Sequence, residues 1–227
     1  MNEQKKVLLI IGSPRAQSTS ASLGTYLLSS MWDNGSEVAS VQVNKILKSD
    51  KALEEALDAI NKSDVLVMAF PLYVDAVPFP IVKLMEAIAE RRKNNSSLQR
   101  PRMMAIVNCG FPEAHHNDTA LSICRRFAKE ADIDWAGGLG LGGGGAIGGQ
   151  PLDKRRGITK GVKKALDLAA DALVSDRPLP EEAIQLMSRP LMPKWLYLWI
   201  GETGGKRAAK KNGALKNIDE RPYCGEE

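Results

Sequence analysis

The stretch "VLLIIGSPRAQSTSASLG" (Val7–Gly24) changes character at its midpoint. Five apolar residues run without a polar break from Val7 to Ile11, which is typical of a strand buried on both faces of a parallel sheet. The residues that follow are rich in serine and contain one arginine, Arg15. Apolar residues at helical spacing then begin at Leu23. The order of strand, polar loop and helix predicts the first unit of an α/β fold.

The same alternation continues along the chain. Strand-like runs lie at Glu37–Val43, Asp64–Phe70, Met103–Asn108 and Ile133–Leu141. Between and after them, apolar stripes at helical spacing are centred near residues 27, 57, 85, 124 and 166. This pattern predicts a doubly wound, five-stranded parallel sheet with right-handed crossovers, for which the flavodoxin-like order 2-1-3-4-5 is common. In such sheets, ligands bind outside the carboxyl ends of strands 1 and 3, where the strand order reverses.

Length and composition indicate one domain with an appendage. A chain of 227 residues with 44% hydrophobic residues suits one full α/β domain and is too short for two. Beyond residue 174 four prolines interrupt the chain, and the aromatic "KWLYLWI" and basic "GGKRAAKKNGALK" segments follow. We therefore predict a domain over residues 1–174 and a helical appendage over residues 175–227.

Several classes of protein are disfavoured. The start "MNEQKK" lacks an apolar signal segment, and three widely separated cysteines suit neither a disulfide framework nor a CxxC metal site, so we expect a cytoplasmic protein without metal. The apolar run Trp195–Ile200 is much shorter than a membrane span. A net charge of +4, spread along most of the chain, does not suggest nucleic acid.

The loop after the first strand suits an anion, because it directs backbone N–H groups and the positive end of a helix dipole toward one point. Ser13, Ser18 and Ser20 add hydroxyl donors, and Arg15 adds a fixed charge that matches phosphate oxygens. The same residues also form turns and N-caps without any ligand, but their place after the first strand favours phosphate. The pattern GxxxxGK[ST] is missing, so ATP or GTP turnover is not expected.

Two further loops reach the same edge of the predicted sheet. The segment "FPLYVDAVPFPIVKLME" (Phe70–Glu86) is apolar, stiffened by prolines, and carries Tyr73. The segment "NCGFPEAHHND" (Asn108–Asp118) again combines glycine, proline and an aromatic residue. Rigid apolar loops with aromatic side chains suit the face or edge of a flat ring.

The motifs "GSPRAQSTS", "PLYVDAVPFPIVKLME" and "NCGFPE" together resemble the flavodoxin-like NAD(P)H-dependent FMN reductases and quinone reductases. The resemblance covers residues 5–173 as a fold, and "MPKWLYLWIGETGGKRAAKKNG" with "RPY" resembles the tail of a bacterial subgroup of NAD(P)H-dependent oxidoreductases. It implies FMN as cofactor and NAD(P)H as co-substrate. It also implies a homodimer, since sites of this family are usually completed by a neighbouring subunit.

The resemblance assigns cofactor-binding roles to three groups of residues. The phosphate would be held by Ser13, Arg15, Ser18 and Ser20. The ribityl chain and ring would be lined by Pro71, Leu72, Tyr73 and Val74, with Asn108, Cys109, Gly110, Phe111 and Pro112 facing the other side of the ring. No iron–sulfur centre is expected, because the cysteine cluster of related iron–sulfur flavoproteins is missing near the second loop.

No catalytic side chain is assigned, because bound flavin would carry hydride from NAD(P)H to a small acceptor such as a quinone, flavin, nitro or azo compound. His115 and His116 could protonate a product but are more simply loop residues, and Cys109 is more simply a small buried apolar side chain. The glycines of Gly137–Gly149 indicate a mobile or closely packed loop rather than a second dinucleotide site.

Alternatives stay open for the tail and the function. The apolar residues of the tail could dock on the domain, pack against a second subunit or contact a membrane surface, of which the last is least favoured. They are Met187, Leu191, Trp195, Leu196, Trp199 and Ile200. The alternative function is an electron-transfer flavoprotein, which the pI of about 8.9 disfavours because such carriers tend to be acidic. A fold that binds no flavin and acts as an interaction module is a third possibility.

Overall fold

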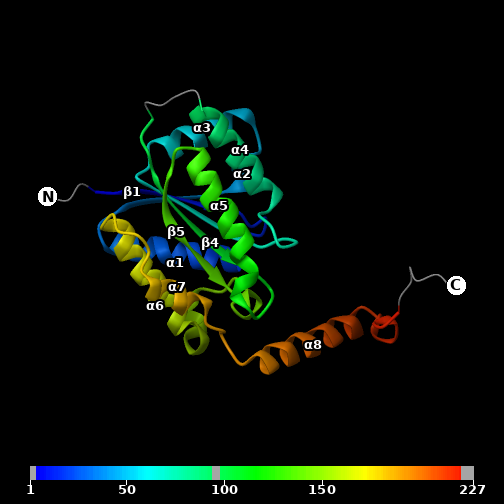
Figure 1. Ribbon diagram of the computed structural model, residues 1–227. Helices are drawn as coiled ribbons and strands as arrows, with labels where there is room; N and C mark the ends of the chain where they lie inside the picture. The colour runs from blue at the N-terminus through cyan, green and yellow to red at the C-terminus, as the bar shows by residue number, and fades with distance from the viewer. Residues whose placement is uncertain (1–3, 94–97, 221–227) are drawn as a thin grey trace. The chain divides into compact units, whose positions relative to one another are not determined.

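The computed structural model describes residues 4–93 and 98–220. Five strands alternate with helices along the chain (Figure 1). The strands are β1 (Lys6–Ile11), β2 (Glu37–Gln42), β3 (Val65–Pro71), β4 (Arg102–Asn108) and β5 (Asp134–Leu141). The α-helices are α1 (Thr19–Asp33), α2 (Val43–Ile46), α3 (Asp50–Asn61), α4 (Phe79–Lys93), α5 (Asp118–Glu130), α6 (Arg156–Val174), α7 (Glu181–Ser188) and α8 (Lys194–Lys211). Single 3₁₀ turns lie at η1 (Ala114–Asn117), η2 (Gly144–Ala146), η3 (Leu152–Arg155) and η4 (Leu215–Asn217).

The strands form one sheet in the order β2-β1-β3-β4-β5, and every neighbouring pair is parallel. The predicted fold class and strand order are therefore confirmed. Each predicted strand overlaps its observed counterpart to within one residue at either end. The continuous apolar run of β1 is explained by burial on both faces, because successive side chains of a strand point to opposite sides.

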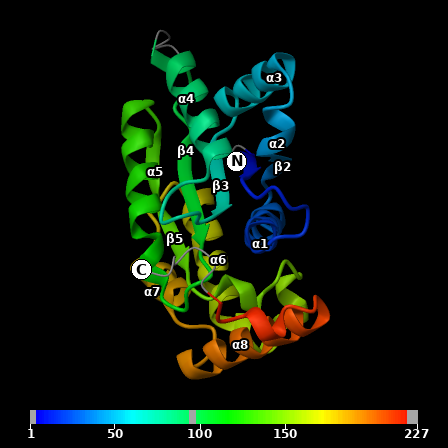
Figure 2. The ribbon, with the colours of Figure 1, turned by 90° about the vertical axis from the view of Figure 1, so that its right-hand side faces the viewer.

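Two hydrophobic clusters cover the two faces of the sheet. Alternate residues of β1 and β3 pack with α1, α6 and α7 on one face, and the remaining residues pack with α2, α3, α4 and α5 on the other. Figure 1 shows these helices on opposite sides of the sheet, and in Figure 2 α4 and α5 run side by side. Burial of both faces fixes the strand register and thereby the edge at which the loops meet.

The segment after α6 packs with the domain. Ala183 and Met187 of α7 are completely buried, and the backbone N–H of Leu179 donates to the Ala136 carbonyl at 3.2 Å. Contacts divide the chain into one unit over Met1–Leu191 and a second over Met192–Glu227. This division lies downstream of the boundary that the sequence suggests at residues 174 and 175, because α7 supplies apolar side chains to the core of the first unit.

The second unit contains α8 and η4. None of the residues of α8 is buried, and Trp195, Leu198 and Trp199 are each more than half exposed. Within the described residues, no helix combines the length and the apolar character needed to cross a membrane.

Candidate functional site

The loop between β1 and α1, residues 12–18, lies at the carboxyl edge of the sheet where the strand order reverses. Gly12 begins it and is closely surrounded: a Cβ at this position would lie 2.6 Å from the Phe70 Cβ and from the Ile81 Cγ1. Ser13 is buried, and its Oγ accepts a hydrogen bond from the backbone N–H of Arg15 at 3.3 Å. The Arg15 side chain extends from this turn in an exposed position.

Ser18 is the N-cap of α1. Its backbone is extended and its Oγ accepts from the backbone N–H of Ala21 at 3.1 Å, as expected for a serine that begins a helix. The backbone N–H groups of Gln17 and Thr19 donate no hydrogen bond to any residue that the structure describes. Free N–H groups at the start of a helix, next to an arginine, are the kind of donors that suit an anion.

Side chains at the start of α1 join this first loop to two other segments. They are the third loop, which follows β4, and the glycine-rich segment Gly137–Gly149. The Ser20 hydroxyl, almost completely buried, lies 2.7 Å from the Asn108 Oδ1 and donates to it. The Thr19 hydroxyl donates to the carbonyl of Gly144 at 2.8 Å, and the Gly144 N–H donates to the Cys109 carbonyl at 2.9 Å. The structure thus brings predicted residues of two loops together, and Ser20 reaches the site by holding Asn108.

The second loop ends in a tight turn. Tyr73 and Ala76 exchange both backbone hydrogen bonds, at 3.1 Å and 3.0 Å, and the two residues between them have positive φ angles of 48° for Val74 and 56° for Asp75. Such angles are unusual for a β-branched residue and store strain at the tip. The Val74 side chain is 99% exposed, and Tyr73 is also exposed, whereas Leu72 is half-buried and its N–H donates to the Asn108 carbonyl at 2.8 Å.

The third loop presents a group of rings. The Phe111 ring, 54% exposed, lies with its centroid 4.4 Å from that of His116, which in turn stacks on His115 at 4.5 Å. The His116 Nε2 lies 3.9 Å from a carboxylate oxygen of Glu113. The two histidines thus contact other side chains of their own loop. Together with Tyr73 and Phe79, Phe111 provides exposed apolar surface at this edge of the sheet.

Cys109 is buried beneath the third loop. Its thiol lies within hydrogen-bond range of the Phe111 and Glu113 carbonyls, at 3.5 Å and 3.6 Å, and Asn117 approaches it at 3.6 Å. Burial raises the pKa of the Cys109 thiol above its ordinary value, which favours the protonated, less reactive form. The side chain therefore packs inside the loop, and the backbone carbonyl of Cys109 faces the glycine-rich segment.

The glycine-rich segment Gly137–Gly149 contributes to the site, which the sequence analysis did not resolve. Its first residues, Gly137–Leu141, lie within β5, and the rest pack against the first and third loops. A Cβ on Gly142 would lie 2.3 Å from the Pro112 carbonyl oxygen, and one on Gly149 would lie 2.8 Å from the Ser18 nitrogen. The density of glycines was the available signal, since only glycine permits two backbones to approach so closely.

Comparison with known proteins supports the fold. The sequence profile of a family described as "Flavodoxin-like fold" matches residues 5–126 of the chain. No curated protein sequence matches the chain. Solved structures do match the chain. Their sequence identities are low, so these matches show only its fold.

Three of these structures are similar over most of the chain. An NADH:FMN oxidoreductase in its apo form is 16% identical with a TM-score of 0.58, over 84% of this chain and 97% of its own. An FMN-dependent NADH-azoreductase from Bacillus anthracis, in complex with FMN, is 15% identical with a TM-score of 0.55, over 75% and 100%. An NAD(P)H:quinone oxidoreductase from Methanothermobacter marburgensis is 11% identical with a TM-score of 0.55, over 74% and 96%.

Proposed function

The chain belongs to the flavodoxin-like fold family, and on that premise we propose that it is an FMN-dependent oxidoreductase that passes reducing equivalents from NAD(P)H to a small acceptor. The observation that carries the proposal is the anion site between β1 and α1. There, free N–H groups at a helix start lie beside Arg15, at the edge where open α/β sheets bind ligands. The similar structures of an NADH:FMN oxidoreductase and an FMN-bound azoreductase support the choice of ligand.

The residues present fit FMN in their chemistry. The phosphate would be held by the first loop, where Arg15, Ser13 and the N–H groups of Gln17 and Thr19 are available as donors. Gly12 lets the start of this loop pack directly on the core, because a Cβ there would lie 2.6 Å from side-chain atoms of Phe70 and Ile81. The exposed rings of Tyr73 and Phe111, on the second and third loops, would flank the isoalloxazine ring.

When bound, FMN supplies the redox chemistry, because its ring accepts a hydride and passes the electrons on. The chain itself contributes position. Asn108 is fixed by Ser20 on one side and by Leu72 on the other, so the second and third loops stay in register with the phosphate loop. Fixed loops keep the ring and the nicotinamide at reacting distance. The free thiols of Cys109 and Cys124 are compatible with the cytoplasmic location that we propose.

The visible absorption spectrum tests this function. The purified protein, incubated with excess FMN and desalted, should keep one FMN per chain, and NADH or NADPH should bleach it under anaerobic conditions. Steady-state oxidation of NAD(P)H with a quinone, an azo dye or free flavin should follow ping-pong kinetics. A protein that stays colourless would contradict the proposal. Bound FMN without NAD(P)H turnover would instead favour the electron-transfer alternative.

Arg15→Ala should weaken FMN binding by about 1.5 kcal/mol, roughly tenfold in Kd, because a charge-assisted hydrogen bond at an exposed position is lost. Affinity for riboflavin, which has no phosphate, should stay the same. Fluorescence titration of both ligands measures the difference. The matched control is Arg189→Ala, an exposed arginine of the same domain that should leave both affinities unchanged. An equal loss for FMN and riboflavin would remove Arg15 from the phosphate site.

We further propose that the protein is a homodimer and that α8 packs against a second copy. The exposed side chains of Trp195, Leu198 and Trp199 support this, because adjacent large apolar residues on a helix mark an interaction surface. Light scattering after size-exclusion chromatography should give twice the chain mass. A chain ending at residue 191 should be monomeric. Dimers of the shortened chain, or binding of the full chain to anionic vesicles, would contradict this arrangement.

A further inference from the structure

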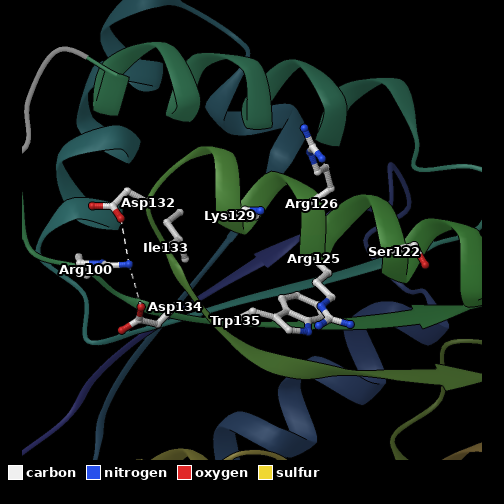
Figure 3. Close-up of a pocket in the computed structure, with 9 residues that line it drawn as sticks. All are labelled: Arg100, Ser122, Arg125, Arg126, Lys129, Asp132, Ile133, Asp134 and Trp135. Atoms are coloured by element: carbon white, nitrogen blue, oxygen red, sulfur yellow. Dashed lines mark ion pairs between the residues drawn. The ribbon is translucent and has the colours of Figure 1, made fainter.

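A second pocket lies at the other end of the sheet. Its volume is about 680 Å³, within the range of small-molecule sites, and it is formed by the last turns of α5 and the first residues of β5 (Figure 3). Arg102 pairs with Asp134 at this end of β4, whereas Asn108 pairs with Leu141 at the candidate flavin site. Six residue steps along a strand span about 20 Å, so the two sites are separate.

The pocket carries more positive charge than its own acids neutralise. Arg100 is held between two carboxylates, those of Asp132 at 2.9 Å and Asp134 at 3.2 Å, as Figure 3 shows. Arg126 forms an ion pair with Glu130 at 2.8 Å. The two remaining cations of the lining are Arg125 and Lys129.

Arg125 and Lys129 have no ion pair or hydrogen bond with any residue that the structure describes. They lie one helical turn apart on α5, where like charges repel each other. Lys129 is in the last turn, where the negative end of the helix dipole favours a cation, but this effect fades within one turn and does not account for Arg125. A dianion placed beside both side chains would relieve the repulsion.

The third feature of the pocket is an aromatic surface. Trp135 is half-buried and packs in part against the core, and a Cβ on Gly138 would lie 3.3 Å from its Cζ2 atom. Arg125 extends from α5 toward this indole (Figure 3), whereas Arg126 points away from it. A fixed indole next to a free guanidinium offers a stacking partner for a planar ring.

The loop that closes the pocket is rigid. Arg92, almost completely buried, donates to the carbonyls of Ala131 and Asp132 at 2.7 Å and 3.0 Å. Asp132 adopts a positive φ of 52°, which these bonds hold in place, and its carboxylate is thereby directed to Arg100. The pocket is thus formed before any ligand arrives, which lowers the entropy lost on binding.

We propose that this pocket binds an organic phosphate with a planar base, of the class of the nucleoside monophosphates, as a site separate from the flavin. The phosphate dianion lies between Arg125 and Lys129, and the base stacks on Trp135. The charges match, since two unpaired cations meet a group with a charge close to −2. The proposal does not depend on the redox activity, because none of these residues belongs to the loops at the other edge of the sheet.

Adenosine 5′-monophosphate is the probe, and the protein is first loaded with FMN and desalted, so that the flavin site is occupied and no free FMN competes with AMP for the pocket. We expect saturable binding in calorimetry and a shift of one indole N–H signal in the ¹H–¹⁵N spectrum, assigned to Trp135 by its loss in Trp135→Phe. Adenosine and inorganic phosphate should each bind at least about tenfold more weakly than AMP. Adenosine keeps only the stacking on Trp135, and phosphate keeps only the contacts with Arg125 and Lys129.

Arg125→Gln and Lys129→Gln should each weaken AMP binding about fivefold, which is the effect of one exposed charge pair. The matched control is Arg126→Gln, which removes the same charge from the same helix at a residue paired with Glu130, and its affinity should change less than about twofold. These positions are exposed, so unchanged melting temperatures are expected.

Two outcomes would overturn the proposal. One is a Trp135 signal that AMP does not shift, and the other is a loss of AMP affinity in Arg126→Gln equal to that in Arg125→Gln. A Trp135 signal that poly-glutamate shifts and AMP does not would identify the pocket as a docking site for an acidic protein. A protein that binds AMP here but no FMN would leave this proposal standing and would remove only the proposed oxidoreductase activity.

Discussion

Arg92→Ala is expected to lower the free energy of unfolding by about 4 kcal/mol, the largest single effect that we predict for a polar residue of this chain. Arg92 is 6% exposed, and its guanidinium donates four hydrogen bonds, to the Asn61 Oδ1 and to the carbonyls of Gln99, Ala131 and Asp132. Burial lowers the pKa of Arg92 below its ordinary value, but an arginine still carries its charge at neutral pH. Truncation therefore leaves the buried Ala131 carbonyl and three partly buried acceptors without their donor, and a cavity beside them.

Urea unfolding followed by circular dichroism measures this loss. The matched control is the neighbouring Arg91→Ala, because Arg91 forms only solvent-exposed ion pairs with Glu54 and Asp58. Its loss should be below about 1 kcal/mol. Similar values for the two variants would show that the buried hydrogen bonds of Arg92 contribute little to stability. Arg92→Ala should also weaken AMP binding, because the Asp132 backbone is no longer held.

Gly142→Ala is expected to destabilise the protein by about 3 kcal/mol, near the upper end of the usual range for overpacking. The new methyl group would lie 2.3 Å from the Pro112 carbonyl oxygen and 2.9 Å from the Ala114 nitrogen. Both are backbone atoms, so no side-chain rotation removes the clash. The third loop must move away from β5, and FMN binding should weaken with it.

Gly157→Ala in α6 provides the control, since a Cβ at Gly157 meets no atom within 4 Å and Gly157 lies outside the loops of the candidate flavin site. We expect no loss of melting temperature or of FMN affinity relative to the unmodified protein. Thermal unfolding and flavin fluorescence measure the two quantities for both variants. Retention of full FMN affinity by Gly142→Ala would show that the contact between the third loop and the glycine-rich segment does not shape the flavin site.

The sheet could be predicted from the sequence because its signals are local. A strand buried on both faces needs an unbroken apolar run, and Val7–Ile11 supplies one. The end of the domain could not be placed in the same way. Prolines at 178 and 180 suggest a linker, whereas Leu179 contacts Gly137 and the neighbouring backbone of β5, and α7 returns to the core. Long-range packing decides that segment, and no short pattern encodes it.

The same limit applies to the candidate site, where local features could be predicted from the sequence and long-range contacts could not. Composition and position alone lead to the prediction of Ser13, Arg15 and Ser18 as site residues. The partner of Ser20 could not be read from the sequence, because Asn108 is 88 residues away. The role of Gly144 was also hidden, since a glycine run is equally typical of a flexible loop and of close backbone packing. The structure resolves this ambiguity by placing the Gly144 carbonyl against the Thr19 hydroxyl.

The hydrogen bonds from Ser20 to Asn108 and from Thr19 to Gly144 have a consequence for the speed of association. They join three loops through protein atoms alone, so assembly of the binding edge occurs during folding and needs no ligand. The observed rate of FMN capture should therefore rise linearly with FMN concentration, in a single exponential phase without a slow rearrangement. Ser20→Ala would remove the direct hydrogen bond between α1 and Asn108 and loosen the third loop, and a second, concentration-independent phase should then emerge in stopped-flow traces.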